Sequence, residues 1–298
     1  MPTLTRNDCA WCGAPLDDGV RLQGRVRCAA CGVATTFPWP SPSELDAAYA
    51  DWYRPAGGRF SGLGDRALRF TRGRLSRRID RIAPAGPVLD IGAGDGTLLD
   101  ALRARGREAV GVERNASGPG IREGEPGEER AGAWAAVVLW HSLEHLPEPG
   151  ATIDTAATLL RRGGVLIVAV PNSASLQARV FGDRWLALDL PRHLVHLTAT
   201  ALLERVRTAG MRVERVSYLR GGQVVFGWLH GLVGLLPGHP NLYDAVRRPA
   251  ARSAPMPPTV RLPTLVAAAL LLPLAALASL VEVSVRRGGT VYLEARLA

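Results

Sequence analysis

Residues 87–102 read PVLDIGAGDGTLLDAL, and this stretch decides which fold the chain is expected to adopt. Residues 88–91 are an apolar run that predicts a short buried strand, and an amphipathic helix is expected from Thr97 onward. The glycines between them let the backbone approach a ligand closely and turn sharply into the N-terminus of the helix. The stretch therefore predicts a strand, a ligand-binding loop and a helix in direct succession.

A dinucleotide-binding loop is one interpretation of these glycines. Its fingerprint is Gly-x-Gly-x-x-Gly, in which the third glycine lets the helix pack closely on the strand. Here the third glycine, Gly96, comes one residue early, and Thr97 stands where that glycine belongs. Asp90, two residues before Gly92, can accept hydrogen bonds from a cationic amino group but does not cradle a pyrophosphate. The loop therefore favours a cationic ligand.

Further segments follow this loop in an order that resembles the class I S-adenosylmethionine-dependent methyltransferases. Residues 108–113 (EAVGVE) resemble the second strand of that family, and residues 135–147 (AAVVLWHSLEHLP) its fourth strand and the following loop. Residues 159–172 (LLRRGGVLIVAVPN) resemble the glycine turn and fifth strand. Residues 191–198 (PRHLVHLT) resemble the branch that includes ubiquinone-biosynthesis O-methyltransferases. The resemblance covers about residues 85–220.

This resemblance implies an α/β fold with a seven-stranded, doubly wound, Rossmann-like sheet and S-adenosylmethionine as cofactor. Glu113, 21 residues after Gly92, stands where an acid grips ribose hydroxyls. The family also has a third strand and an acid for the adenine amino group, for which the chain offers only a short polar stretch with Glu123 or Glu125. The expected cofactor-binding residues are Asp90, Gly92, Gly94, Gly96, Glu113 and Trp140.

Four of the six histidines fall in two of these segments. Imidazole, with an ordinary pKa near ~6.5, is well matched to removing a proton from a hydroxyl group or an enolisable carbon at neutral pH. In the family, residues just after the fourth strand line the methionine part of the cofactor and the acceptor. His145 is the first candidate for a base, with His141 beside it. His193 and His196 are candidates for a second wall of the acceptor pocket, and Arg192 could pair with an acidic group of the substrate.

The four cysteines lie within the first 31 residues as two Cys-x-x-Cys pairs, fifteen residues apart. A glycine follows each pair and lets the chain turn tightly past the sulfurs. Two such pairs complete a tetrahedral shell of four thiolates, which is typical of a zinc ribbon with a structural ion. No basic start followed by an apolar run precedes them, so a reducing cytoplasm is expected. The predicted zinc ligands are Cys9, Cys12, Cys28 and Cys31.

An apolar insertion of roughly 70 residues is expected between two strands near the C-terminus, at residues 211–218 and 290–297. Residues 262–281 are twenty uncharged residues, long enough to cross a bilayer. A single crossing would separate the last strand from its sheet, so a lid that dips into a membrane surface is favoured over a soluble lid. The expected organisation is a zinc ribbon (1–40), a helical linker (41–84) beginning with a helix N-capped by Ser43, a methyltransferase domain (85–220 and 288–298) and the insertion (221–287).

Composition leaves the partner open. Hydrophobic residues make up 47% and charged residues 21% of the chain, which excludes wholesale disorder. All 36 basic residues are arginine, a uniformity that indicates coding bias, so the net charge of +9 is weak evidence for a nucleic-acid partner. We expect methyl transfer to an oxygen or carbon of a small lipophilic acceptor. An RNA base methyltransferase and a non-catalytic binding protein are the alternatives, and a homodimer through the insertion stays open.

Overall fold

The core of the protein is a seven-stranded sheet. Its strands lie in the order β10 (Met211–Ser217), β11 (Thr290–Leu297), β8 (Leu160–Pro171), β7 (Trp134–Trp140), β4 (Val88–Ile91), β5 (Ala109–Glu113) and β6 (Ile121–Glu123). The computed structural model describes residues 6–50, 60, 63–114, 118–219 and 222–298. The five strands from β8 to β6 are parallel, and β11 runs antiparallel to both β8 and β10. This arrangement confirms the predicted doubly wound sheet.

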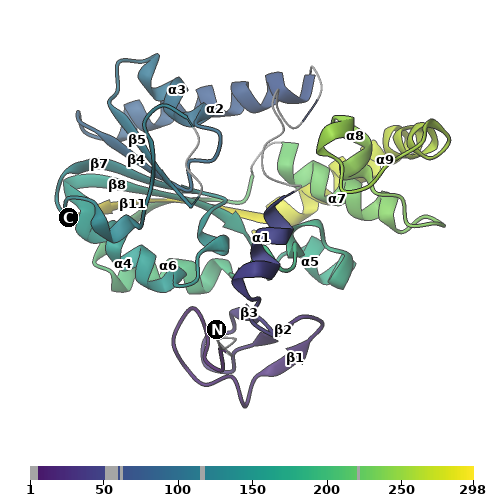
Figure 1. Ribbon diagram of the computed structural model, residues 1–298, viewed down its shortest axis with the longest axis horizontal. Helices are drawn as coiled ribbons and strands as arrows, with labels where there is room; N and C mark the ends of the chain where they lie inside the picture. The colour runs from purple at the N-terminus through teal and green to yellow at the C-terminus, as the bar shows by residue number, and fades with distance from the viewer. Residues whose placement is uncertain (1–5, 51–59, 61–62, 115–117, 220–221) are drawn as a thin grey trace.

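Helices cover both faces of this sheet. Figure 1 shows α2 (Leu63–Ile82) and α3 (Thr97–Arg103) on one face, and α4 (Pro149–Leu159) and α6 (Ala199–Thr208) on the other. Strands β4, β7 and β8 are almost continuously apolar, as expected for parallel strands covered on both faces. Arg78 of α2 donates hydrogen bonds of 2.8 and 2.6 Å to the buried carboxylate of Glu294 in β11. This ion pair ties α2 to the antiparallel edge of the sheet.

The third strand of the parallel half is short. Only Ile121 to Glu123 pair with β5, which places Glu123 opposite Glu113 in the register. The 3-10 turn η1 (Pro126–Glu128) follows it. The polar stretch that the sequence offered for this strand therefore does form it, and both of its candidate acids come at or just after its carboxyl end.

The helix after the ribbon begins earlier than predicted. Helix α1 spans Pro42–Ala50, with a proline at its first position. Ser41 caps it, because the Ser41 hydroxyl accepts a hydrogen bond from the Glu44 amide and the Glu44 carboxylate accepts one from the Ser41 amide. This reciprocal pair is a capping box. The prediction of Ser43 as the N-cap was wrong, and Tyr53, where the sequence predicts the end of this helix, lies outside the described residues.

The amino-terminal cysteines lie in turns beside the strands of a second, smaller sheet. Strands β1 (Val20–Leu22), β2 (Arg25–Arg27) and β3 (Ala34–Thr36) pair antiparallel in succession. Strand β9 (Val195–His196), from the main body of the chain, completes this sheet by pairing with β3. Trp11 and Val33 of the ribbon share one hydrophobic core with Leu194 and Val195. The ribbon is therefore joined to the main body through a sheet and a core.

The insertion between β10 and β11 is helical. It contains α7 (Gly222–Gly234), α8 (Leu242–Val246), the 3-10 turn η5 (Pro249–Ala251) and α9 (Pro258–Ser284), which lie together at one end of the molecule in Figure 1. Helix α9 has 27 residues, contains an 18-residue stretch with a mean hydropathy of 2.4, and continues through Pro263 and Pro273. The structure thus has, within the described residues, one helix long and apolar enough to cross a membrane.

One buried carboxylate attaches α9 to the protein. Glu282 is fully buried and accepts hydrogen bonds from the Gln177 side chain and the Trp228 indole, both at 2.9 Å. Gln177 belongs to α5 (Leu176–Phe181), and Trp228 belongs to α7. The connection from α5 to β9 contains two 3-10 turns, η3 (Gly182–Arg184) and η4 (Leu186–Leu188). The hydrogen bonds of Glu282 hold one face of α9 against the protein, and the leucine-rich face of this helix is exposed.

Candidate active site

The glycine loop follows β4 at the carboxyl edge of the sheet. Gly92 has a φ of 78°, and a Cβ atom there would lie 2.2 Å from the Cβ atom of Ser142. The Ser142 hydroxyl donates a hydrogen bond of 2.5 Å to the carbonyl oxygen of Ile91. Both the left-handed backbone and the close approach of Ser142 require glycine at this position.

Asp90 is a buried carboxylate with an unused acceptor. It is 3% exposed, and its Oδ1 atom has no hydrogen-bond partner. Burial raises the pKa of Asp90 to about 7, although the nearby Arg72 guanidinium opposes this increase. An unpaired carboxylate in an apolar wall is stabilised by any cationic group that reaches it. This position fits the ammonium group of S-adenosylmethionine.

The two acids at the ends of β5 and β6 stand beside this loop. Glu113 accepts a hydrogen bond of 2.9 Å from the Gly94 amide, and Glu123 and Glu125 line the same cavity. Gly96 lies elsewhere: it is the N-cap of α3 with a φ of 72°, close to Ile121, and is not among the described residues that line the cavity. Glu113, Gly94 and the third-strand acids are therefore brought together, whereas Gly96 shapes the start of α3.

The cavity extends from this loop along the carboxyl ends of β4, β5, β6 and β7 to the helical insertion. Its volume is about 2970 Å³, well above the roughly 300–1,000 Å³ of a site for one small ligand. Trp140 lines it, with the Arg72 guanidinium 5.1 Å from its ring and Tyr292 packed against it edge to face. The volume of the cavity leaves room for both a cofactor and an acceptor.

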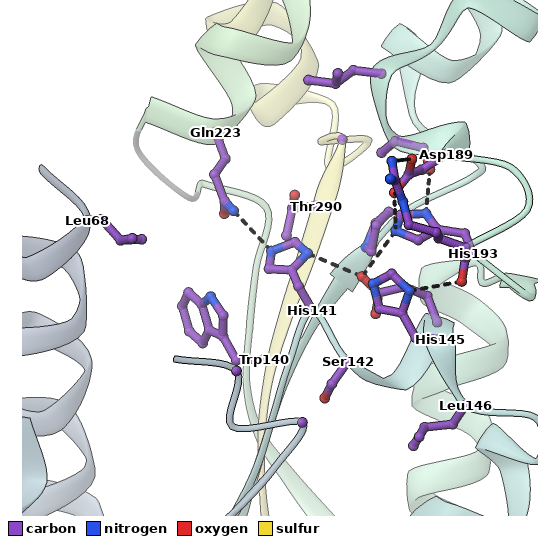
Figure 2. Close-up of a pocket in the computed structure, with 18 of the residues that line it drawn as sticks. Leu68, Trp140, His141, Ser142, His145, Leu146, Asp189, His193, Gln223 and Thr290 are labelled. Carbon is purple, nitrogen blue, oxygen red and sulfur yellow. Dashed lines mark hydrogen bonds and ion pairs between the residues drawn. The ribbon is translucent and has the colours of Figure 1, made fainter. Parts of the chain in front are cut away.

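His141 lies at the junction of β7 and the insertion. Its φ of 52° is unusual for a residue with a side chain, and its amide donates a hydrogen bond of 2.7 Å to the Ala169 carbonyl. The ring Nδ1 lies 3.4 Å from Glu144, and the ring Nε2 lies 3.1 Å from the side-chain nitrogen of Gln223 in α7 (Figure 2). The amide nitrogen of Gln223 is a donor, so Nε2 accepts and Nδ1 carries the proton that faces Glu144.

Glu144, in the 3-10 turn η2 (Leu143–His145), is the most buried charge near these rings. Its exposure is 2%, and neither carboxylate oxygen has a hydrogen-bond partner. Burial alone would raise the pKa of Glu144, but the neighbouring imidazoles of His141, His145 and His193 outweigh burial and lower it to about 2. Glu144 is therefore ionised inside the protein.

His145 and His193 pack edge to face, with ring centroids 4.6 Å apart. Burial is the main cause that lowers the pKa of His145 to about 4, so this ring is neutral near pH 7. His196 does not join them. It is buried against the ribbon, with its Nε2 3.2 Å from the Thr36 hydroxyl, and is absent from the described lining of the cavity. The structure thus brings His141, His145 and His193 together and leaves His196 at the seam with the ribbon.

Several residues of this site went unrecognised in the sequence. Glu144 stands inside the Leu-Glu-His-Leu motif, so its position between two histidines was the available signal. Ser142 and Gln223 have no comparable signal, because one acts through a contact with Gly92 and the other comes from the insertion. Tyr49 of α1 also reaches the site, with its hydroxyl 3.0 Å from the His145 Nδ1. Contacts between distant segments explain why Ser142, Gln223 and Tyr49 were missed.

The four cysteine sulfurs form a separate cluster in the ribbon. They all lie within 4.8 Å of one another, and the Cys9–Cys31 and Cys12–Cys28 sulfur pairs are 3.7 and 3.8 Å apart. Bonds of about 2.3 Å to a tetrahedral zinc ion place two sulfurs about 3.8 Å apart. These spacings fit zinc, and they exceed the ~2.05 Å of a disulfide bond.

Comparisons with known proteins identify a methyltransferase domain in the chain. A family model described as a methyltransferase domain matches residues 67–216, half of the chain. A ubiquinone biosynthesis O-methyltransferase from Xanthomonas axonopodis pv. citri (strain 306) is 29% identical over 161 residues, which cover 46% of this chain and 67% of the relative. The corresponding protein of Xylella fastidiosa (strain 9a5c) is 28% identical over 171 residues, or 48% of this chain and 70% of the relative. A methyltransferase structure from Archaeoglobus fulgidus has a TM-score of 0.49 and 16% identity, with 76% of this chain and 93% of that chain covered.

The raised pKa of Asp90 predicts that the free energy of unfolding of the cofactor-free protein depends on pH. Between pH ~4 and ~7 the folded state keeps a proton on Asp90 that the unfolded chain has lost, so stability falls as pH rises through this window. Asp90→Asn should therefore raise the free energy of unfolding at pH 8 by a few kcal/mol, at roughly 1.4 kcal/mol for each unit of the pKa shift. The gain should shrink at pH 5. Urea unfolding without cofactor measures both values, with exposed Asp100→Asn as control, and equal gains at both pH values would contradict this assignment.

Proposed function

The chain belongs to the methyltransferase-domain family, and on this premise we propose that it transfers the methyl group of S-adenosylmethionine to an oxygen or carbon of a small lipophilic acceptor. The observation that carries the proposal is the unpaired, buried carboxylate of Asp90 beside the glycine loop. The cofactor supplies an electrophilic methyl group on a sulfonium centre. Every other contribution comes from residues of the chain that bind, orient and exclude water.

Three groups would hold the cofactor. Asp90 would accept hydrogen bonds from its ammonium group, and the loop at Gly92 and Gly94 allows the backbone to approach it. Glu113 would face the ribose hydroxyls, because it ends the strand next to β4. Glu123 and Glu125 remain the candidates for the adenine amino group. These residues all line one continuous cavity. Gly96, which the sequence also predicted to bind the cofactor, caps α3 instead.

His141 fits the role of the base better than His145. Its Nε2 is the accepting nitrogen, and the Gln223 amide already stands where the hydroxyl of an acceptor would donate. The buried carboxylate of Glu144, near Nδ1, would stabilise the imidazolium that forms when Nε2 takes a proton. The His145 Nδ1 is bonded to the Arg192 carbonyl, and burial holds the pKa of this ring at about 4, which makes it a weaker base.

The insertion supports a lipophilic acceptor. Its helix α7 places Phe226 and Gln223 in the wall of the cavity, and Tyr243 of α8 packs against Phe226. Leu68 and Phe70 of α2 contribute to the opposite wall. Helix α9, which packs on α7 and α8, presents an exposed apolar face, so an acceptor that partitions into a membrane could approach the site from that side.

Calorimetric titration with S-adenosylmethionine tests the proposed function. Asp90→Asn, which keeps the shape of the side chain but removes its charge, should weaken binding roughly 10- to 100-fold. His141→Gln should keep the affinity and lower methyl transfer to a lipophilic phenol or quinol panel by roughly 10²- to 10⁴-fold. The exposed Asp100→Asn variant serves as control for both measurements.

Two results would overturn this function. Absence of binding by folded wild-type protein would refute the use of the cofactor. Binding without turnover on any acceptor of the panel would favour a non-catalytic binding protein.

The ribbon is proposed to hold one structural zinc ion through Cys9, Cys12, Cys28 and Cys31. Wild-type protein should release one zinc ion per chain when a mercurial reagent blocks its thiolates. Cys28→Ser should release much less and should unfold at a lower temperature, because the ribbon shares strand β9 with the main body. The exposed ribbon variant Asp18→Asn is the control, and protein that releases no zinc on thiol modification would contradict the assignment.

Helix α9 is proposed to lie in the surface of a membrane. Strands β10 and β11 pair with each other, so both ends of the insertion return to one sheet edge, which a single crossing cannot satisfy. Leu270 and Leu277 are 77% and 58% exposed, while Glu282 on the other face is buried. One face of α9 is therefore apolar and exposed, as a helix in a membrane surface requires, and the other face packs on the protein.

Vesicle sedimentation tests this position of α9. The double variant Leu270→Gln/Leu277→Gln should lower the affinity for phosphatidylcholine–phosphatidylglycerol vesicles at least about tenfold, because two leucine side chains leave the lipid. Val20→Gln, the same type of change at an exposed residue of β1, should have no effect. Equal sedimentation of both variants would contradict an interfacial α9, and resistance of the wild type to alkaline extraction would indicate a spanning segment instead.

A further inference from the structure

The cavity continues into a groove between α2 and the edge strand β10. The face of β11 that carries Glu294 meets α2, because Arg78 of that helix binds the Glu294 carboxylate. Arg215 of β10 pairs opposite Glu294 in the register, so its side chain stands on the same face of the sheet. Arg78, Arg215 and Glu294 all line the cavity. Helix α2 and strand β10 therefore form the two sides of this groove.

Arginines from both sides make the groove positively charged. Arg74, Arg78 and Arg81 are four and three residues apart, which places them on one face of α2. Among the described residues of α2, β10 and β11, Glu294 is the one acid that lines the cavity. Its carboxylate already accepts hydrogen bonds from Arg78 and from the Tyr292 hydroxyl. The basic groove, as we call it, consists of Arg74, Arg77, Arg78, Arg81 and Arg215.

Four arginines of the basic groove lack an acidic partner. Within the described part of the chain, all of them except Arg78 form neither an ion pair nor a hydrogen bond with a carboxylate. Arginines elsewhere are paired: Arg122 binds Glu129, and Arg205 binds Asp154. The basic groove therefore carries positive charge that the protein itself does not neutralise.

The alternative is a solvated helix face, which is the usual explanation for a run of arginines. Arg66 and Arg69 of α2 show that arrangement, because both are exposed and neither is among the described residues that line the cavity. Arg74 and Arg81 instead share a groove with Arg215 of another element. Cations that converge in a groove repel one another unless an anion lies between them. The grouping across two elements therefore favours an anionic ligand.

The basic groove begins near Trp140. Tyr292 packs edge to face on Trp140 and lines the cavity beside it. Arg72 of α2 lies over the Trp140 ring. A rise of about 1.5 Å per helical residue places Arg78 about 9 Å and Arg81 about 14 Å further along the helix. An anion in the groove would therefore lie roughly 10 Å from an acceptor atom beside Trp140.

We propose that the basic groove binds a phosphate or diphosphate group carried by the acceptor. This inference rests on the proposed function and names the class of its acceptor: a lipophilic molecule with a phosphate ester roughly 10 Å from the atom that is methylated. Guanidinium groups suit this role, because they bind phosphate oxygens through paired, charge-assisted hydrogen bonds. Phe70 and Leu219, which are 59% and 61% exposed, line the same cavity and would contact the apolar part of the acceptor.

Calorimetric titration of the full-length protein with geranyl diphosphate tests the basic groove, with geraniol and inorganic pyrophosphate as comparison ligands. Geranyl diphosphate should bind at least about tenfold more tightly than either of them, because it offers both the charge and the apolar chain. Arg74→Gln/Arg215→Gln should lower the affinity for geranyl diphosphate at least about tenfold and leave the affinity for S-adenosylmethionine unchanged. Arg66→Gln/Arg69→Gln, the same change on the solvated face of α2, should bind both ligands as the wild type does.

Circular dichroism checks that both double variants fold, and the single variant Arg77→Gln replaces Arg74→Gln/Arg215→Gln if that protein does not. Equal affinity of the wild type for geranyl diphosphate and geraniol, or the same loss in both double variants, would overturn the basic groove as an anion site. Pyrophosphate binding as tight as that of geranyl diphosphate would overturn the acceptor and indicate a site for a free anion.

Cofactor titration separates this inference from the proposed function. Wild-type protein that binds S-adenosylmethionine but shows no preference for geranyl diphosphate would refute only the phosphate-bearing acceptor. Wild-type protein that binds geranyl diphosphate through these arginines but does not bind S-adenosylmethionine would refute the methyltransferase function and leave the anion site in place.

Discussion

The close approach of Gly92 to Ser142 is the contact on which the site depends. It occurs where β4 and β7, neighbouring parallel strands, end at the same edge of the sheet. The Ser142 hydroxyl bonded to the Ile91 carbonyl locks the loop after β7 to the loop after β4. One of these loops carries the glycines and directly follows the strand that holds Asp90, and the other carries His141, Glu144 and His145. A side chain larger than hydrogen at position 92 would force the two loops apart and separate cofactor binding from the proposed base.

Four of the buried carboxylates are of two kinds: two have all their hydrogen bonds, and two keep oxygens without one. Glu282 and Glu294 are buried with complete sets of partners, and each ties a helix to the body of the protein. Asp90 and Glu144 are equally buried but keep oxygens without a hydrogen bond. An unpaired buried charge is destabilising unless something binds it. Asp90 and Glu144 both line the same cavity, where a ligand could bind them. Glu282 and Glu294 need no ligand, because their hydrogen bonds are already formed within the protein.

Local sequence patterns predicted the elements whose identity depends on neighbours along the chain. The strand–loop–helix at residues 87–102, the alternating last strand and the apolar helix follow from periodicity and glycine placement, whereas the resemblance to the methyltransferases implied the other long strands of the parallel sheet. The capping of α1 was misassigned by two residues, because Ser41 and Ser43 have the same capping preference, and Pro42 at the first helical position together with the reciprocal bonds of Ser41 and Glu44 decides for Ser41. Strand β9, the contact of Gln223 with His141 and the position of His196 depend on pairing across more than 80 residues. No local pattern encodes such pairing.

Hydrogen bonds from the ribbon hold the backbone of the segment that carries His193, a residue that lines the cavity. The Thr36 hydroxyl donates a hydrogen bond of 2.7 Å to the His193 carbonyl, and the Thr36 amide donates one of 2.9 Å to the Leu194 carbonyl. Strand β3 then pairs with β9 immediately after these residues. The backbone of His193 is thereby held from one side by the ribbon, while its ring faces the cavity from the other. An ordered ribbon consequently constrains the position of a ring in the site without any cysteine approaching the chemistry. This explains physically why a small cysteine-rich module precedes a methyltransferase sheet that already has its own core.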